Sequence, residues 1–437
     1  MKKFLPVFLL TIFTVFAYGE DLDKKLTDAV RDGDYTEVRR LLIRGANPDA
    51  KDSMGNTALV MAVNNGSEEI ADVLIKSGAY TSESYMRGMS VLMLAINKQM
   101  DETAVRLIKF GADTTAKLNN GSNALMMASE RNLENVVREI ILRRQVDINA
   151  KTSQGAAALS IALKAKNMGV AKMLHKNGAK PLNLLEAAYM SDIEASEKII
   201  AGGADIEVRD EKGRTPLLVA FLYEDYSMAS FLLSKGADIN VRDYYGLAPV
   251  LIASMANNGA LLALCFDNKA DALVQDVNGI NPLMFLVFFE NDSLVDATIN
   301  YDSKSVNCVD NNGLTPLAIA ISKNNKPVAE KLIAKGAYIN SKRSRRPLNV
   351  SIELGNLDTA KLVLDKGARI NAKDFNGTAP IITAASMNNA EAVRFLLANG
   401  AKKNIRDAAG LTPLDYAKKF SNKEIIYMLE SANSRRH

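Results

Sequence analysis

The feature that most constrains the fold of this chain is an internal repeat with a period of about 33 residues. One segment occurs five times, as GNTALVMA at Gly55, GRTPLLVA at Gly213, GLTPLAIA at Gly313, GTAPIITA at Gly377 and GLTPLDYA at Gly410. A second segment has an apolar pair and two further residues before Gly-Ala, and it begins at Leu41, Leu74, Leu107, Leu232, Leu332, Val363 and Leu396. A copy this short cannot bury its own apolar face, so the copies must stack into an array.

Each part of the repeated segment has a physical role. Gly55 and its equivalents suit a tight turn, because glycine adopts a positive φ without steric cost. The Thr before Pro216, Pro316 and Pro413 is a natural N-cap, and a proline at the first helical position loses no hydrogen bond. The Gly of Gly-Ala ends a second helix in the left-handed conformation. The repeat therefore predicts a turn followed by two helices.

In this register the sequence resembles the ankyrin repeat family. The matching elements are a turn with Asp-x-x-Gly, TPLxxA at the start of a first helix, LLxxGA at the end of a second helix, and Asp-Ile-Asn before the next turn. About thirteen copies fit between Asp21 and the C-terminus. The resemblance implies an all-α fold: an ankyrin-repeat solenoid of paired antiparallel helices with short β-turn fingers. It also implies a protein partner, held on the concave face made by the fingers and the first helices.

The chain departs from the family pattern in two ways. The family's His, two places after the Pro, is replaced in every copy, by Leu218, Leu251, Met284, Ala318, Asn349, Ile382 and Asp415. Because the family draws polar capping interactions from this His, we expect a looser array. The spacing also shortens between Gly178 and Gly203, where KPLNLLEAAYM enters a helix without a finger. We therefore divide the array into residues 20–180, a truncated repeat at 181–203, and residues 204–437. The truncated repeat is either a kink with a function or a neutral deletion.

The N-terminus has the pattern of a secretory signal. Residues 1–19 combine Lys2 and Lys3 with an apolar run and a small-residue site before Glu20, which predicts cleavage and a periplasmic or secreted bacterial protein. The alternative is a retained anchor, although the run is shorter than a bilayer span of roughly 20 residues. Residues 1–19 hold two lysines and no acids, so the rest of the chain has 52 basic and 50 acidic side chains. That balance predicts neither nucleic-acid nor membrane binding after cleavage.

The sequence contains little that could support catalysis. The two histidines are His175 and His437, and the two cysteines are Cys265 and Cys308. Two cysteines without paired histidines do not make a four-ligand metal site. We expect no enzyme activity, no metal and no cofactor. A single disulfide between Cys265 and Cys308, and an unrecognised enzyme site around His175, are kept as alternatives.

Aromatic residues gather at the surface positions of neighbouring repeats. The register places Tyr223, Tyr244, Tyr245, Phe285, Phe288 and Phe289 at fingers and at the outer side of first helices. Aromatic side chains bury a large area at low entropic cost and are enriched at interface centres. We therefore predict that these six residues form the partner-binding surface. The alternative is that the rings pack between neighbouring helices.

One basic segment, SKRSRR, lies where a finger should project. Its Lys342, Arg343, Arg345 and Arg346 could meet an acidic partner surface, or could simply form a solvated loop.

Together these observations predict a non-enzymatic, monomeric scaffold that is exported and binds a partner protein. The alternative function is that of a secreted effector whose array addresses a host protein. The sequence does not name the partner, because ankyrin arrays share a framework and differ at their surfaces.

Overall fold

The structure is a computed structural model that describes residues 21–431 except 86–87, 342 and 375. The predicted signal segment, residues 1–19, lies outside the described residues, as do Lys342 and His437. The chain divides between Met190 and Ser191 into two compact units, called unit 1 and unit 2 below. Each unit is described by itself.

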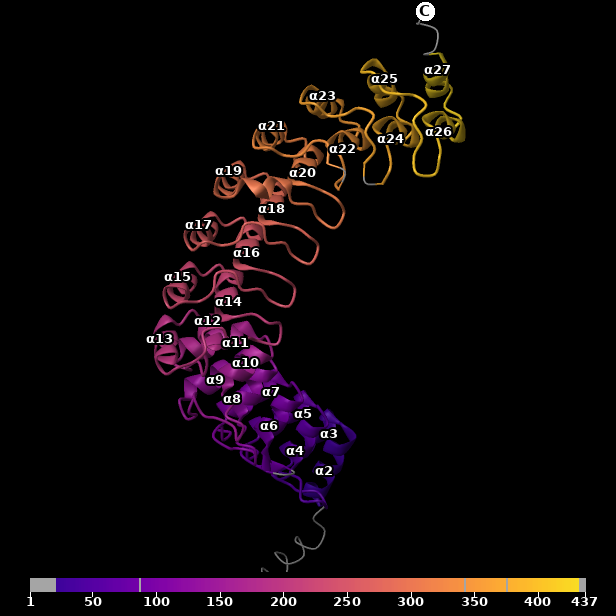
Figure 1. Ribbon diagram of the computed structural model, residues 1–437. Helices are drawn as coiled ribbons and strands as arrows, with labels where there is room; N and C mark the ends of the chain where they lie inside the picture. Colours follow the sequence, from indigo (N-terminus) through magenta and orange to yellow (C-terminus); the bar gives the residue numbers. More distant parts are fainter. Residues whose placement is uncertain (1–20, 86–87, 342, 375, 432–437) are drawn as a thin grey trace, which may run out of the picture. The chain divides into compact units, whose positions relative to one another are not determined.

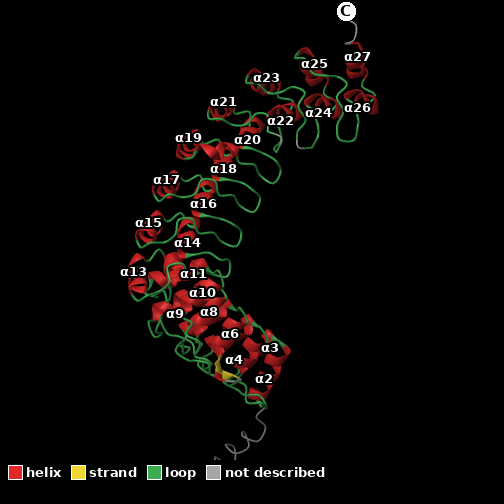
Figure 2. Cartoon of the chain, viewed as in Figure 1, coloured by secondary structure: helices red, strands yellow, loops and turns green. Residues whose placement is uncertain are grey.

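Unit 1 contains eleven described helices and one small hairpin (Figures 1 and 2). Its helices are α2 (Leu22–Asp32), α3 (Tyr35–Ile43), α4 (Ala58–Asn64), α5 (Glu68–Lys76), α6 (Val91–Asn97), α7 (Asp101–Lys109), α8 (Ala124–Glu130), α9 (Glu134–Arg143), α10 (Ala158–Lys164), α11 (Met168–Lys176) and α12 (Leu184–Met190). The antiparallel strands β1 (Ser84–Tyr85) and β2 (Met89–Ser90) form one finger.

Unit 2 continues the alternation of short and long helices. Its helices are α13 (Ile193–Ala201), α14 (Pro216–Leu222), α15 (Tyr226–Ser234), α16 (Pro249–Met255), α17 (Gly259–Asp267), α18 (Pro282–Phe288), α19 (Asp292–Tyr301), α20 (Pro316–Ser322), α21 (Lys326–Ala334), α22 (Pro347–Glu353), α23 (Leu357–Asp365), α24 (Pro380–Ser386), α25 (Ala390–Ala398), α26 (Pro413–Lys419) and α27 (Lys423–Ser431), with a 3-10 turn η2 (Ser303–Asn307). In Figure 1 the even-numbered first helices of unit 2 form one row, the odd-numbered second helices form another, and the fingers extend from the first-helix side.

In chain order, the 26 helices of the described residues make thirteen pairs. This confirms the all-α repeat fold and the predicted number of copies. After α3 the first helices have seven residues and the second helices nine or ten. Helices this short are marginal in isolation, so their stability comes from stacking on neighbours.

The predicted caps form as expected. The backbone N–H of Leu218 donates to Thr215 Oγ1 at 3.4 Å at the start of α14, and the threonines that begin α20 and α26 cap in the same way. The second-helix glycines are left-handed, as at Gly236 with φ of 96°. The local sequence therefore sets where each helix begins and ends.

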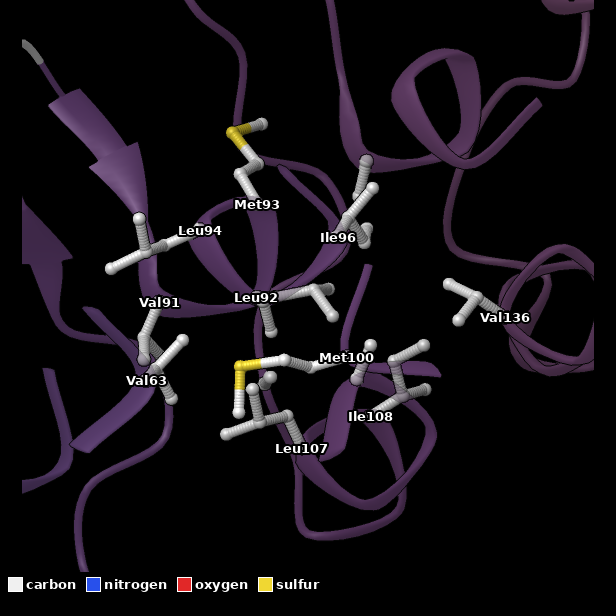
Figure 3. Close-up of a cluster of buried hydrophobic side chains, with 14 of the residues drawn as sticks. Val63, Val91, Leu92, Met93, Leu94, Ile96, Met100, Leu107, Ile108 and Val136 are labelled. Atoms are coloured by element: carbon white, nitrogen blue, oxygen red, sulfur yellow. The ribbon is translucent and has the colours of Figure 1, made fainter. Parts of the chain in front are cut away.

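The core of unit 1 runs continuously through its helices, as Figure 3 shows around α6 and α7. The labelled buried side chains are Val91, Leu92, Met93, Leu94 and Ile96 of α6, Met100 before α7, Leu107 and Ile108 of α7, Val63 of α4 and Val136 of α9. Each repeat thus completes the core of the next.

The positions of the missing family His are mostly apolar and buried. Leu218, Leu251 and Met284 are at most 1% exposed. In these copies the side chain at the His position is therefore part of the apolar core and makes no polar cap. Asn349 keeps a polar role, because its side-chain amide donates to Thr378 O at 2.9 Å. The looser array expected from this change stays a prediction.

The finger before α12 is absent from the chain path. α11 ends at Lys176 and α12 begins at Leu184, whereas α15 ends at Ser234 and α16 begins at Pro249. The boundaries 20–180, 181–203 and 204–437 and the altered curvature at residues 181–203 stay predictions.

Candidate protein-binding face

The six aromatic residues predicted as a binding surface all lie in unit 2. Tyr244 and Tyr245 belong to the finger between α15 and α16 and are 70% and 55% exposed. Tyr223 is the C-cap of α14, and Phe289 is the C-cap of α18. Phe288 ends α18 and is 53% exposed.

Phe285, the sixth residue, is only half-buried rather than exposed, because it lies one turn back from the end of α18. The face is therefore built from helix ends and a fingertip more than from the middle of a helix.

The finger that carries the two tyrosines is held by an aspartate. Asp243 Oδ1 accepts hydrogen bonds from the backbone N–H groups of Tyr245 and Leu247, both at 2.9 Å. The backbone N–H of Tyr244 donates to Lys212 O at 3.0 Å, which ties this finger to the preceding one. These bonds fix the backbone while both rings stay exposed.

Tyr244 also depends on a glycine in the neighbouring finger. A Cβ added to Gly213 would lie 2.6 Å from Tyr244 Cδ1, and Gly213 has φ of 76°. Glycine at this place serves both the left-handed turn and the close approach of the ring.

The end of α18 presents two phenylalanines in contact. The Phe288 and Phe289 ring centroids are 5.6 Å apart in an edge-to-face arrangement, which aromatic pairs favour. Lys323 Nζ lies 4.1 Å from the Phe288 centroid, and it pairs with Glu290 at 3.7 Å. Lys323 thus covers part of the Phe288 ring, and both phenylalanines stay about half exposed.

The inner side of the same helix already supplies the core. Leu283, Leu286 and Val287 are fully buried, as the repeat register predicts. The two exposed phenylalanines are therefore not required to complete the stack, and they expose apolar area that single scattered residues would not.

The exposed apolar positions continue beyond the predicted six. At the ends of the first helices of unit 2 lie Leu222, Tyr223, Met255, Phe288, Phe289, Leu354, Met387 and Phe420, each between 39% and 55% exposed. We call these eight residues the apolar row. Most of the exposed aromatic rings of this row belong to α14 and α18, with Phe420 at α26, and the other repeats contribute aliphatic or Met side chains. The missed signal is a recurrence at 33-residue spacing, at Leu222, Met255, Phe288, Leu354, Met387 and Phe420. The first three end their helices, and the last three are C-caps.

The predicted basic segment is largely turned inward. Arg343 is exposed, but Arg345 pairs with Glu353, and Arg346 is buried with Nε donating to Lys373 O at 2.8 Å. Burial, and then the neighbouring Arg369 charge, lower the pKa of Arg346. The described part of the segment is therefore neither a solvated loop nor a uniform basic surface.

The histidine and cysteines considered for catalysis, a disulfide or a metal site have the following surroundings. His175 Nδ1 lies 3.1 Å from Ala179 O at the end of α11. Cys265 and Cys308 are free thiols, so no disulfide joins them, and burial raises the pKa of both. Within the described residues, no three or more His, Cys, Asp or Glu side chains gather in a group suited to a metal ion.

A hollow of about 510 Å³ opens between α8 and α10 of unit 1, and its lining includes Ser122, Glu130 and Lys164. Its lining mixes polar and apolar residues, and we recognise no catalytic arrangement among them.

No helix in the described part of the chain has the length and apolar character needed to cross a bilayer.

A family model for ankyrin repeats, built of three copies, matches residues 26–117, 92–183, 184–276, 250–343, 283–374 and 348–435. These matches span nearly the whole chain, so the protein belongs to the ankyrin repeat family. It is a repeat scaffold of a class that mediates protein–protein interaction and is generally non-catalytic.

A curated relative matches a short part of the chain. The inactive serine/threonine-protein kinase TEX14 of Bos taurus is 38% identical over 61 residues, which is 14% of this chain. The match spans 4% of that protein's length, so it speaks only for the shared repeats.

Proposed function

We propose that this chain is an exported, non-enzymatic scaffold that binds a partner protein on its concave face, where the fingers and first helices of unit 2 meet the solvent. The contact residues are Tyr223, Tyr244, Tyr245, Phe285, Phe288 and Phe289. The observation that carries the proposal is that five of these six aromatic residues are exposed although the core beneath them is complete. Clustered exposed aromatic residues usually mark interaction sites.

The binding test uses affinity capture with the chain that begins at Glu20. We expect Phe288→Ser combined with Tyr245→Ser to abolish capture of the partner and leave the melting transition in place, because both side chains are half exposed. The matched control is Phe110→Ser with Tyr80→Ser in unit 1, where the same residue types are 53% and 58% exposed. Equal capture by the two double variants would contradict the proposal, and a lost melting transition would instead assign the rings to the core.

Export to the periplasm or beyond is the second part of the proposal. It is supported by the basic start, the apolar run and the small-residue site within residues 1–19. The mass of the chain recovered from the periplasmic fraction should correspond to a start at Glu20. A chain that keeps Met1 in the cytoplasmic fraction would contradict it.

A further inference from the structure

The apolar row of unit 2 is continuous enough to define the kind of partner it fits. Successive first helices from α14 to α26 are in contact along unit 2. Each layer except α20 contributes at least one member of the row, at the last residue or the C-cap of its first helix. At α20 the place is taken by Ser322 and Lys323, and Lys323 lies over the Phe288 ring. The row therefore offers one apolar contact per layer over most of the unit.

The spacing of the row matches an α-helix. Packed helices lie about 8 to 10 Å apart, which sets the distance between layers. A helix rises about 1.5 Å per residue, so side chains seven residues apart recur every ~10.5 Å on one face. Alternate residues of a β-strand recur every ~6.7 Å and fall out of step with the layers.

The polar residues beside the row also favour a helix over an extended segment. Asn291 Nδ2 donates to Asn257 Oδ1 at 2.8 Å, and Asn356 and Asn422 make the equivalent bond to the preceding layer at 2.7 Å. These amides are already engaged with one another. An added β-strand needs partners for its backbone groups on the surface it binds, whereas a helix satisfies its own.

Charge along the row gives the partner a direction. Lys418 and Lys419 are exposed at the α26 end, while Glu224 is exposed near the α14 end. A helix carries partial negative charge at its C-terminus and partial positive charge at its N-terminus. Its C-terminal end, with acidic side chains, therefore fits over α26, and its N-terminal end fits toward α14.

We propose that the apolar row binds an amphipathic α-helix of the partner, with an apolar residue in each heptad and its acidic C-terminal end over α26. This inference rests on the proposed function and deepens it by naming the partner's chemistry. It adds Leu222, Met255, Leu354, Met387 and Phe420 to the contact surface.

The test uses a synthetic peptide of four heptads, about 42 Å long as a helix, with Leu at positions a and d. Its first two heptads carry Lys and its last two carry Glu at the flanking positions. Binding to the chain that begins at Glu20 is followed by fluorescence anisotropy, and the peptide's helix content by circular dichroism. We expect saturable binding at least tenfold tighter than that of a composition-matched scrambled peptide or a charge-reversed peptide.

The protein variants distinguish binding at the apolar row from nonspecific binding to other exposed apolar side chains. Leu354→Asn with Met387→Asn should weaken peptide binding at least tenfold. Met54→Asn with Leu142→Asn, at exposed unit 1 positions, should leave binding unchanged. All four side chains are more than half exposed, so the melting transition should stay in place for both variants.

Several outcomes would overturn the helix assignment. These are equal binding of the scrambled peptide, no saturable binding of the helical one, tighter binding of a proline-rich peptide of equal length, and sedimentation as a dimer that the row variant abolishes. If partner capture still depends on Phe288 and Tyr245 in that case, the proposed function stands without the helix. If capture does not depend on them, the proposed function itself fails.

Discussion

The two units use one repeat framework but end their first helices differently. In unit 2 these ends carry the apolar row. In unit 1 the same places, the last residue and the C-cap of α4, α6, α8 and α10, are Asn64, Asn65, Asn97, Lys98, Glu130, Arg131, Lys164 and Ala165. Both sets lie over fully buried inner sides, such as Leu92 in α6 and Leu283 in α18. The stack therefore does not require apolar residues at these ends, which points to a role in binding for those of unit 2.

The fingers of the two units are also held differently. In unit 1, backbone bridges join Lys51 to Thr57, Lys117 to Asn123 and Lys151 to Ala157. In unit 2, an aspartate side chain accepts backbone N–H groups within the finger, at Asp210, Asp243, Asp276, Asp310, Asp374 and Asp407. Asp52 does the same in unit 1. Unit 2 thus relies more on ionised carboxylates, and its fingers should respond more to pH.

The largest expected effect comes from opening the core of one unit. Phe221 of α14 is fully buried, and Phe221→Ala should cost about 3 to 5 kcal/mol. Because repeats interact mainly with their neighbours, hydrogen exchange should rise around α14 first and leave α4–α8 protected. Leu92→Ala in α6 is the matched change in unit 1 and should show the reverse pattern. If either variant reduced hydrogen-exchange protection in both units, the two units would not unfold independently, and the prediction would be wrong.

A medium effect is expected from acid. Burial opposes ionisation of Asp210, but the hydrogen bonds from Arg214 and Lys212 and the Arg214 charge together outweigh it, so the pKa of Asp210 lies below its ordinary value. A lowered folded-state pKa stabilises the fold above the unfolded value of about 3.8, and this stability is lost as the pH falls through the folded value. The loss should be about 1 kcal/mol for this finger.

Amide exchange measured from pH 6 down to pH 3 checks this expectation. Lys212 and Arg214, whose N–H groups bond to Asp210, should lose protection in acid. The unit 1 finger joined by the bridge between Lys117 and Asn123 should change less. Asp210→Asn is the control, because it should remove the pH dependence at Arg214. Equal acid sensitivity of the two fingers would contradict the comparison.

The smallest expected effect concerns the turns between paired helices. Lys166 in unit 1 and Asn257 in unit 2 both have positive φ, at 63° and 53°. Lys166→Gly should stabilise by about 0.5 to 1 kcal/mol, since a left-handed conformation is costly for a side chain with Cβ. Asn257→Gly should gain less or lose stability, because Asn257 Oδ1 accepts from Asn291. Thermal melts of the two variants test this prediction. An equal gain in stability for both would show that the asparagine pairs do not stabilise unit 2.

The sequence by itself determined the repeat, the helix boundaries and the inward stripe. These depend on interactions within one copy, such as the Thr215 cap or the left-handed Gly236, and on a spacing that repeats many times. A period of this kind can be read without knowing any neighbour. The same register placed Tyr244, Tyr245 and Phe288 correctly at exposed sites.

Only the tertiary structure decided which surface residues are exposed and which residues lie beside them. Arg346 reads as a solvated base in the sequence, but the shortened turn buries it against Lys373 O, which lies in the next finger. The sequence does not distinguish Leu354 and Met387 from other helix-end residues, but the structure exposes both at the C-caps of α22 and α24. The physical reason is that exposure depends on side chains one repeat away in the sequence, whose packing no local pattern describes.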